Sequence, residues 1–251
     1  MDPYVHTEID QSLATITFFH PSSNSFPSVQ LQKLVKAISD LEEQENVSVI
    51  LLKSAGEKAF CAGASFDELL AVKDEENGLA FFSGFAHVIN AMRKSSKLII
   101  GRIQGKTVGG GVGIAAACDY TFAHSNAAIK LSELAIGIGP FVIEPAVSRK
   151  IGLPAMSEMT LNPIEWKSAQ WAFENKLFTQ LFDDVEEMDV AIKAFAQQLS
   201  SYNPMALKEM KRVFWSGTEH WDQLLTERAK ISGRLVLSDF TIDALTQFKT
   251  K

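Results

Sequence analysis

The chain has 251 residues, of which 46% are hydrophobic and 22% are charged, so it can bury a core of ordinary globular proportions. Its formal net charge of −6 disfavours a protein that binds nucleic acid or anionic lipid through a broad basic surface. The two cysteines, Cys61 and Cys118, form no CxxC pair and lie near no histidine at metal-ligand spacing, so we expect neither a metal site nor a disulfide framework.

The N-terminal segment carries no recognisable targeting signal. Residues Met1–His6 lack the basic stretch and following apolar run of a secretory signal. No stretch of about 18 apolar residues, the length that a membrane-spanning helix needs, occurs in the chain. The sequence therefore predicts a cytoplasmic protein that has no membrane partner.

The first part of the chain alternates between strand and helix patterns. Leu13–Phe19 is rich in β-branched and aromatic residues, as in a strand, and Val29–Leu41 places apolar residues three and four positions apart, as in an amphipathic helix. Strand patterns return at Asn46–Leu52 and Lys97–Ile103, with a helical stretch near Gly78–Met92 between them. Strands that alternate with helices predict an α/β core.

The second part of the chain becomes increasingly helical. A glycine-rich connection leads into an apolar helix at Val112–Cys118, and strands are predicted at Asp119–Ala123 and Ala127–Leu131. Beyond about Pro140 the strand pattern persists only at Leu177–Phe182. The predicted helices of this part are Pro154–Leu161, Pro163–Asn175, Val185–Ser200, Pro204–Trp215 and Glu219–Leu235.

Two glycine-rich segments, residues 58–66 (KAFCAGASF) and 103–113 (IQGKTVGGGVG), stand out for their chemistry. Small residues let a ligand approach the backbone and leave N–H groups free to donate. Donors that are fixed before the reaction stabilise a developing enolate oxygen. Two loops that supply one N–H each would form an oxyanion hole, although each segment alone could equally be a tight turn or a close helix contact.

Together with residues 131–138 (LSELAIGI), these segments resemble the signature of the enoyl-CoA hydratase/isomerase (crotonase) superfamily. The resemblance covers nearly the whole chain and implies a crotonase-like spiral of β-β-α units over residues 1–195, which holds the active site. A helical trimerisation region over residues 196–251 would follow. The resemblance further implies an acyl-CoA thioester substrate, no cofactor apart from the CoA of that substrate, and a homotrimer or hexamer.

The resemblance also implies roles for individual residues. The N–H groups of Ala64 and Gly110 would hold the thioester oxygen, and Glu133 would be the carboxylate that exchanges protons with substrate or water. Typical hydratases place a second glutamate, which orients and activates water, at the position of Gly113. Family isomerases that shift a 3-ene to a 2-ene work with one carboxylate at the Glu133 position, so the sequence slightly favours isomerisation.

Glu144 is the candidate for a substitute second carboxylate. We expect it just inside a helix that follows the Glu133 loop, where an acidic residue also interacts favourably with the helix dipole. A catalytic Glu144, or water held by backbone groups, would allow hydration of 2-enoyl-CoA, which is the alternative function. A second alternative is a non-catalytic acyl-CoA-binding protein, which the intact Glu133 and both glycine loops oppose.

Four further residues match positions that contact CoA in the family. Lys58 and Ala62 belong to the first glycine-rich segment, and Phe248 with Lys249 resembles a C-terminal pair that reaches the adenine and phosphate of CoA, often in a neighbouring subunit. Lys58 and the terminal pair are also compatible with an ordinary surface position.

Overall fold

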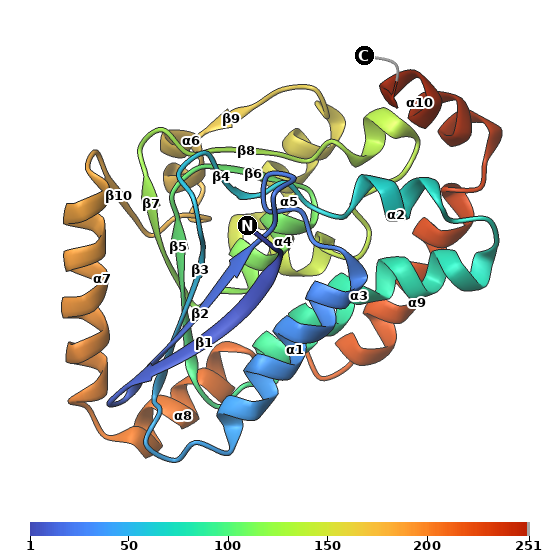
Figure 1. The fold of residues 1–251 in the computed structure, drawn as a ribbon. Helices are drawn as coiled ribbons and strands as arrows, with labels where there is room; N and C mark the ends of the chain where they lie inside the picture. Colours follow the sequence, from blue (N-terminus) through green and yellow to red (C-terminus); the bar gives the residue numbers. More distant parts are fainter. Residues whose placement is uncertain (250–251) are drawn as a thin grey trace.

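The structure is a computed structural model that describes residues 1–249. Two sheets form its centre (Figure 1). The larger sheet contains, in spatial order, β1 (Tyr4–Asp10), β2 (Leu13–Phe19), β3 (Val49–Ser54), β5 (Leu98–Ile103), β7 (Tyr120–His124) and β10 (Gln180–Phe182). The smaller sheet contains β4 (Ala59–Cys61), β6 (Lys106–Val108), β8 (Ala128–Lys130) and β9 (Lys167–Ser168).

Successive strands alternate between the two sheets. β3 is followed by β4, β5 by β6 and β7 by β8, and a helix follows each pair: α3 (Glu75–Lys94), α4 (Gly110–Ala117) and α5 (Glu144–Leu161). β1 and β9 run antiparallel to their neighbours, whereas the other neighbouring strands are parallel. This arrangement confirms the predicted spiral of β-β-α units.

The remaining helices complete the fold. They are α1 (Ser28–Glu42), α2 (Phe66–Leu70), the 3-10 helix η1 (Glu133–Ile136), α6 (Ala169–Glu174), α7 (Val185–Ser200), α8 (Pro204–Phe214), α9 (Trp221–Leu235) and α10 (Asp239–Lys249). α9 lies along α3 (Figure 1), and the two helices approach closely where Gly78 faces Gly233. A Cβ atom added at Gly78 would lie 2.8 Å from the Cα atom of Gly233, so this crossing requires small residues.

Strand β3 shows how the larger sheet separates two hydrophobic cores. Val49 and Leu51 join the cluster beneath α7, whereas Ile50 and Leu52 join the main cluster with α1 and α3. Successive side chains of a strand point to opposite faces, so a continuous apolar run is expected where helices cover both faces. Figure 1 shows α7 on one side of the sheet and α1 with α3 on the other.

The predicted helix over Pro163–Asn175 is wrong in its first part. Lys167 pairs with Ile129 of β8 in β9, and the Ser168 hydroxyl then caps α6 by accepting a hydrogen bond from the Trp171 N–H at 3.1 Å. Backbone pairing with the smaller sheet thus overrides the local helical pattern. The strand β1 and the helix α10 were not predicted from the sequence.

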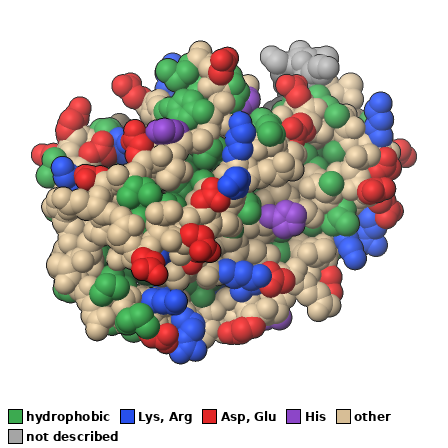
Figure 2. All heavy atoms as spheres, turned by 60° about the horizontal axis from the view of Figure 1, so that its bottom comes forward, with side chains coloured by type: hydrophobic (Ala, Val, Ile, Leu, Met, Phe, Trp, Pro, Cys, Tyr) green, Lys and Arg blue, Asp and Glu red, His purple; other side chains and the backbone are tan. Residues whose placement is uncertain are grey.

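The surface carries charges of both signs. On the face shown in Figure 2, acidic and basic side chains are interspersed with apolar ones. Within the described part of the chain, no helix is both long enough and apolar enough to traverse a bilayer.

Candidate active site

Three parallel strands of the smaller sheet end side by side and bring three segments together. β4 pairs with β6, and β6 pairs with β8. The chain continues from these strands into residues 62–64, 109–110 and 131–133, respectively. Because the carboxyl ends of parallel strands meet at one edge of a sheet, all three segments of the sequence signature converge there, as ligand sites in α/β folds commonly do.

A cavity of about 170 Å³ lies at this edge. Its wall is mostly apolar and is completed by residues of α2, α3 and the connection between η1 and α5. The large apolar lining residues are Phe66, Leu69, Phe81, Phe82, Phe85, Val108, Ile136, Ile138, Phe141, Val142 and Ile143. An apolar pocket into which a few polar groups converge is typical of a small-molecule site.

The first loop is held so that one N–H group remains available. Gly63 has a φ of 88°, a conformation that favours glycine. Its carbonyl accepts a hydrogen bond from the Phe26 N–H at 2.8 Å, and the Ser65 N–H donates to the Phe26 carbonyl at 3.1 Å. The intervening Ala64 N–H has no acceptor among the described residues.

The second loop also holds its free N–H group in a fixed position, between a hydrogen-bonded glycine and the start of a helix. Gly109 has a φ of 53° and donates its N–H to the Lys130 carbonyl at 2.9 Å. Gly110 is the first residue of α4, where N–H groups lack an intrahelical acceptor and the helix dipole is positive. A Cβ atom at Gly63 would lie 3.7 Å from the Gly110 nitrogen, so the two loops are direct neighbours.

The carboxylate of Glu133 lies against the second loop. A Cβ atom added at Gly109 would be 2.7 Å from Oε1 of Glu133, so the carboxylate lies directly against this glycine. Although the residue as a whole is half-buried, its Oε2 atom is buried and accepts no hydrogen bond from the described residues. Burial raises the pKa of Glu133 to about 7, and the opposing effect of its own backbone N–H is smaller. A carboxyl with a pKa near neutrality can exchange protons in both directions.

Ile143 occupies the space beside Gly113. A Cβ atom added at Gly113 would lie 2.4 Å from Cγ2 and 2.7 Å from Cβ of Ile143. A glutamate at position 113 therefore cannot be accommodated while Ile143 keeps its place, because a packed core resists added volume. Since Ile143 also lines the cavity, this part of its wall is hydrocarbon.

Glu144 lies outside the set of described residues that line the cavity. Its Oε1 atom accepts a hydrogen bond from the Ser148 hydroxyl at 2.6 Å, and Oε2 lies 3.8 Å from Nη2 of Arg228. The structure thus places Glu144 in a polar group with Ser148 and Arg228, whereas Glu133 lines the cavity. Among residues 1–249, no group of three or more His, Cys, Asp or Glu could hold a metal ion.

The candidate CoA-contacting residues lie in different settings. Ala62 lines the cavity and donates its N–H to the Ser23 carbonyl at 3.1 Å. Lys58 is exposed directly before β4. Phe248 and Lys249 belong to α10, but their side chains lie outside what the structure describes.

The aromatic part of the cavity wall was not identified from the sequence. Phe81 and Phe85 lie one turn apart on α3 and are both buried. A Cβ atom at Gly110 would lie 2.2 Å from the Phe85 ring, so this ring packs directly against the second loop. The spacing of four residues between Phe81 and Phe85 indicates that they share one helix face. It does not indicate a ligand cavity, because the residues of any buried helix face show the same spacing.

Known proteins have related sequences. A sequence profile of the enoyl-CoA hydratase/isomerase family matches residues 8–238. The chain is 28% identical over 247 residues to the short-chain-enoyl-CoA hydratase of Clostridium acetobutylicum, and the match covers 97% of this chain and 94% of that protein. It is 24% identical over 227 residues to the peroxisomal Delta(3,5)-Delta(2,4)-dienoyl-CoA isomerase of Arabidopsis thaliana, which covers 84% of this chain and 80% of that protein.

The fold has close structural neighbours as well. The crystal structure of enoyl-CoA hydratase from Bacillus halodurans superposes with a TM-score of 0.90 over 97% of this chain and 99% of that chain, at 21% sequence identity. The family profile spans all three segments that meet at the cavity, and this neighbour has the same fold. The chain therefore belongs to the enoyl-CoA hydratase/isomerase (crotonase) family.

Proposed function

We propose that this enzyme of the hydratase/isomerase family moves the double bond of a 3-enoyl-CoA thioester to the 2-position, with Glu133 as the single acid/base. One observation carries the choice within the family. Glu133 is the single carboxylate among the described residues that line the cavity, and Ile143 fills the space beside Gly113 where a second one would lie. A single carboxylate suffices for double-bond migration because the proton that it removes can be returned to another carbon.

In the proposed reaction, the thioester oxygen lies between the N–H groups of Ala64 and Gly110. These donors increase the acidity of the C2 proton, which the Glu133 carboxylate removes. The C2–H electron pair forms the new C2=C3 bond in the conjugated product, while the electrons of the former C3=C4 bond take the proton back from Glu133 at C4. Each fixed donor of an oxyanion hole contributes a factor of roughly 10²–10³ to kcat.

The apolar wall supports this proton transfer. Phe81, Phe85 and Ile143 line the cavity and offer no hydrogen-bonding group to a water molecule. Excluding water strengthens the electrostatic interactions within the site and limits proton loss to solvent. In D₂O, we expect part of the product to retain the original proton at C4, as transfer by one shielded carboxylate requires.

Hydration of 2-enoyl-CoA is the alternative function, and the name of the relative from Clostridium acetobutylicum favours it. The hydrogen bond from Ser148 and the position outside the cavity lining both oppose a role for Glu144 in that reaction. Hydration would then depend on water held by backbone groups. Binding of acyl-CoA without turnover is the second alternative, and the acid/base-competent environment of Glu133 opposes it.

Contacts with CoA and with other subunits are part of the same proposal. The exposed Lys58, next to β4, would meet a CoA phosphate, and Ala62 would contact the pantetheine arm. Assembly into a homotrimer or hexamer would use residues 196–251, where α8 exposes Met205, Met210 and Val213. An exposed apolar patch of this kind commonly marks an interface.

The test is to incubate the purified protein with 2-enoyl-CoA and 3-enoyl-CoA esters of several chain lengths, and to measure water addition and double-bond migration separately. We expect migration without hydration, and a loss of about 10²–10⁴-fold in Glu133→Gln. Glu144→Gln is the matched control and should retain the activity. Rapid hydration would contradict the proposal, and binding of the esters without turnover would favour the binding-only function.

A further inference from the structure

A second cavity, separate from the active site, lies where the C-terminal end of α4 meets α5 and α8. Its volume is about 340 Å³, and it shares no lining residue with the active-site cavity. The charged residues that line it are Asp119, Arg149 and Lys150. Phe214 and Trp215 provide an apolar side.

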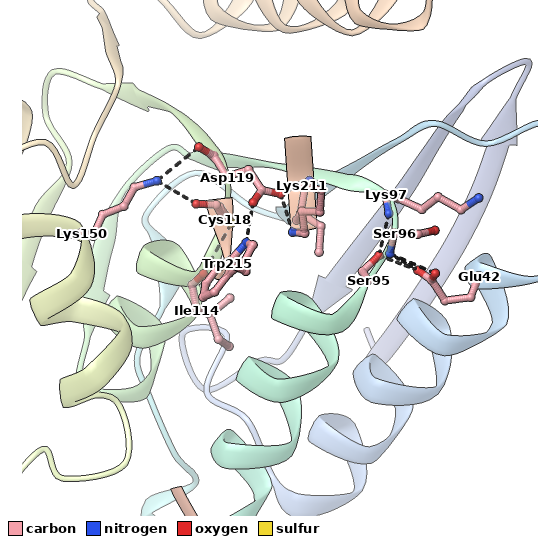
Figure 3. Close-up of polar contacts among 11 residues, drawn as sticks. Glu42, Ser95, Ser96, Lys97, Ile114, Cys118, Asp119, Lys150, Lys211 and Trp215 are labelled. Atoms are coloured by element: carbon pink, nitrogen blue, oxygen red, sulfur yellow. Dashed lines mark hydrogen bonds and ion pairs between the residues drawn. The ribbon is translucent and has the colours of Figure 1, made fainter. Parts of the chain in front are cut away.

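The charge of Asp119 is already matched by a buried lysine (Figure 3). Its Oδ2 atom accepts hydrogen bonds from Nζ of Lys211 at 2.6 Å and from the Ile99 N–H at 2.7 Å. Its Oδ1 atom accepts from Nε1 of Trp215 at 2.8 Å. The side chains of Lys211 and Asp119 are only 2% and 7% exposed, so this pair is closed off from solvent and contributes no excess charge to the cavity.

Lys150 brings a cation to the cavity without a carboxylate partner. Its Nζ atom donates to the Cys118 carbonyl at 2.8 Å and to the Asp119 carbonyl at 3.2 Å (Figure 3). These contacts suit the electronegative C-terminal end of α4, but they use two of the three ammonium donors. Burial lowers the pKa of Lys150, because the charged ammonium is poorly solvated there.

Arg149 adds a second cation with free donors. Its side chain has no ion pair or hydrogen bond within residues 1–249, and its guanidinium lies over the Trp215 ring at 5.0 Å from the ring centroid. Stacking on an aromatic ring orients the planar guanidinium, whose paired N–H groups match an oxyanion. A lone exposed arginine would be an ordinary surface residue, but here it adjoins a partly buried lysine whose hydrogen bonds within residues 1–249 go to backbone carbonyls and not to a carboxylate.

We propose that this cavity binds a small oxyanion, a phosphate or carboxylate group, between the guanidinium of Arg149 and the remaining donor of Lys150. The oxyanion would give Lys150 and Arg149 a direct ion-pair partner, because the carboxylate oxygens of Asp119 already contact Lys211, the Ile99 N–H and Trp215. The apolar side formed by Phe214 and Trp215 suits a ligand with a small carbon skeleton, so the ligand class is a short organic acid or a phosphate monoester.

The test is to titrate the full chain by isothermal titration calorimetry with inorganic phosphate and with propanoate, at pH 7 and constant ionic strength. We expect saturable binding of at least one of these probes and none of chloride. Arg149→Gln should weaken binding at least tenfold, and Lys150→Met should do the same. Lys193→Met removes an exposed lysine of α7 and is the matched control, whose affinity should equal that of the wild type.

The possible outcomes distinguish specific oxyanion binding from a general effect of salt and from an effect on the active site. Binding of phosphate alone would identify a phosphate monoester as the ligand class, and binding of propanoate alone would identify a carboxylate. Equal responses of wild type and Arg149→Gln, or an equal response to chloride, would overturn the proposal. Because Arg149 is exposed, its variant should fold, which circular dichroism can verify. Its turnover of enoyl-CoA should be unchanged, so failure here leaves the proposed activity of Glu133 intact.

Discussion

Replacing the buried carboxylate of Glu133 should stabilise the protein while lowering its activity by about 10²–10⁴-fold. The usual pKa of a glutamate is 4.5, and burial raises that of Glu133 to about 7 in the folded state. The folded protein therefore holds the proton more tightly than the unfolded chain does. Stability is highest below the unfolded pKa and is lost as the pH rises through the folded pKa. The difference between the two pKa values corresponds to about 3 kcal/mol of lost stability above pH 7.

The assay is urea denaturation of the wild type and Glu133→Gln at pH 5 and at pH 8.5. Glutamine keeps the shape of the side chain but cannot ionise. At pH 8.5 we expect the free energy of unfolding of the variant to exceed that of the wild type by about 3 kcal/mol, with an unchanged slope against urea concentration. At pH 5 the advantage should become much smaller, because the wild-type carboxyl is then mostly protonated in the folded state.

Glu144→Gln is the control for the chemical change. Its carboxylate has a hydrogen-bond donor in Ser148, so this variant should not gain stability at pH 8.5. Equal stability of Glu133→Gln and wild type at both pH values would refute the reasoning, since it would mean that the Glu133 carboxylate is solvated in the folded protein.

The remaining predictions concern the pH profile and the packing around the two sites. Isomerisation should rise with pH around an apparent pKa of about 7, because the base must be ionised, and kcat/KM measured from pH 5 to 8.5 checks this. Gly113→Glu alone should lose about 1–3 kcal/mol of stability. Combining it with Ile143→Ala should raise the ratio of hydration to migration in product analysis. Gly110→Ala would collide with an aromatic ring at 2.2 Å and should lower kcat about 10²-fold in steady-state assays. Asp119→Ala leaves Lys211 buried without a counter-charge, which should cost about 3–5 kcal/mol in urea denaturation.

A helix or strand could be predicted from the sequence where its own residues show a clear hydrophobic pattern. The predicted strand Leu13–Phe19 and the predicted helix Val185–Ser200 have the bounds that the structure shows. Each has a strong periodicity or composition of its own. The three-residue strands β4 and β6 could not be predicted in this way, because too few residues are present to show a period. They are strands because they pair with each other, which depends on chain segments more than 40 residues apart.

The same distinction applies to the active site. Three short motifs in the sequence resemble those of the family, and this resemblance implied the roles of Ala64, Gly110 and Glu133, which stay predictions. Only the tertiary structure showed that Ile143 fills the space beside Gly113 and that Glu144 turns toward Ser148. A motif specifies which residue types are present, but which side chain occupies a space depends on packing between helices. Residues 113 and 143 lie thirty positions apart and meet only when α4 and the start of α5 pack together.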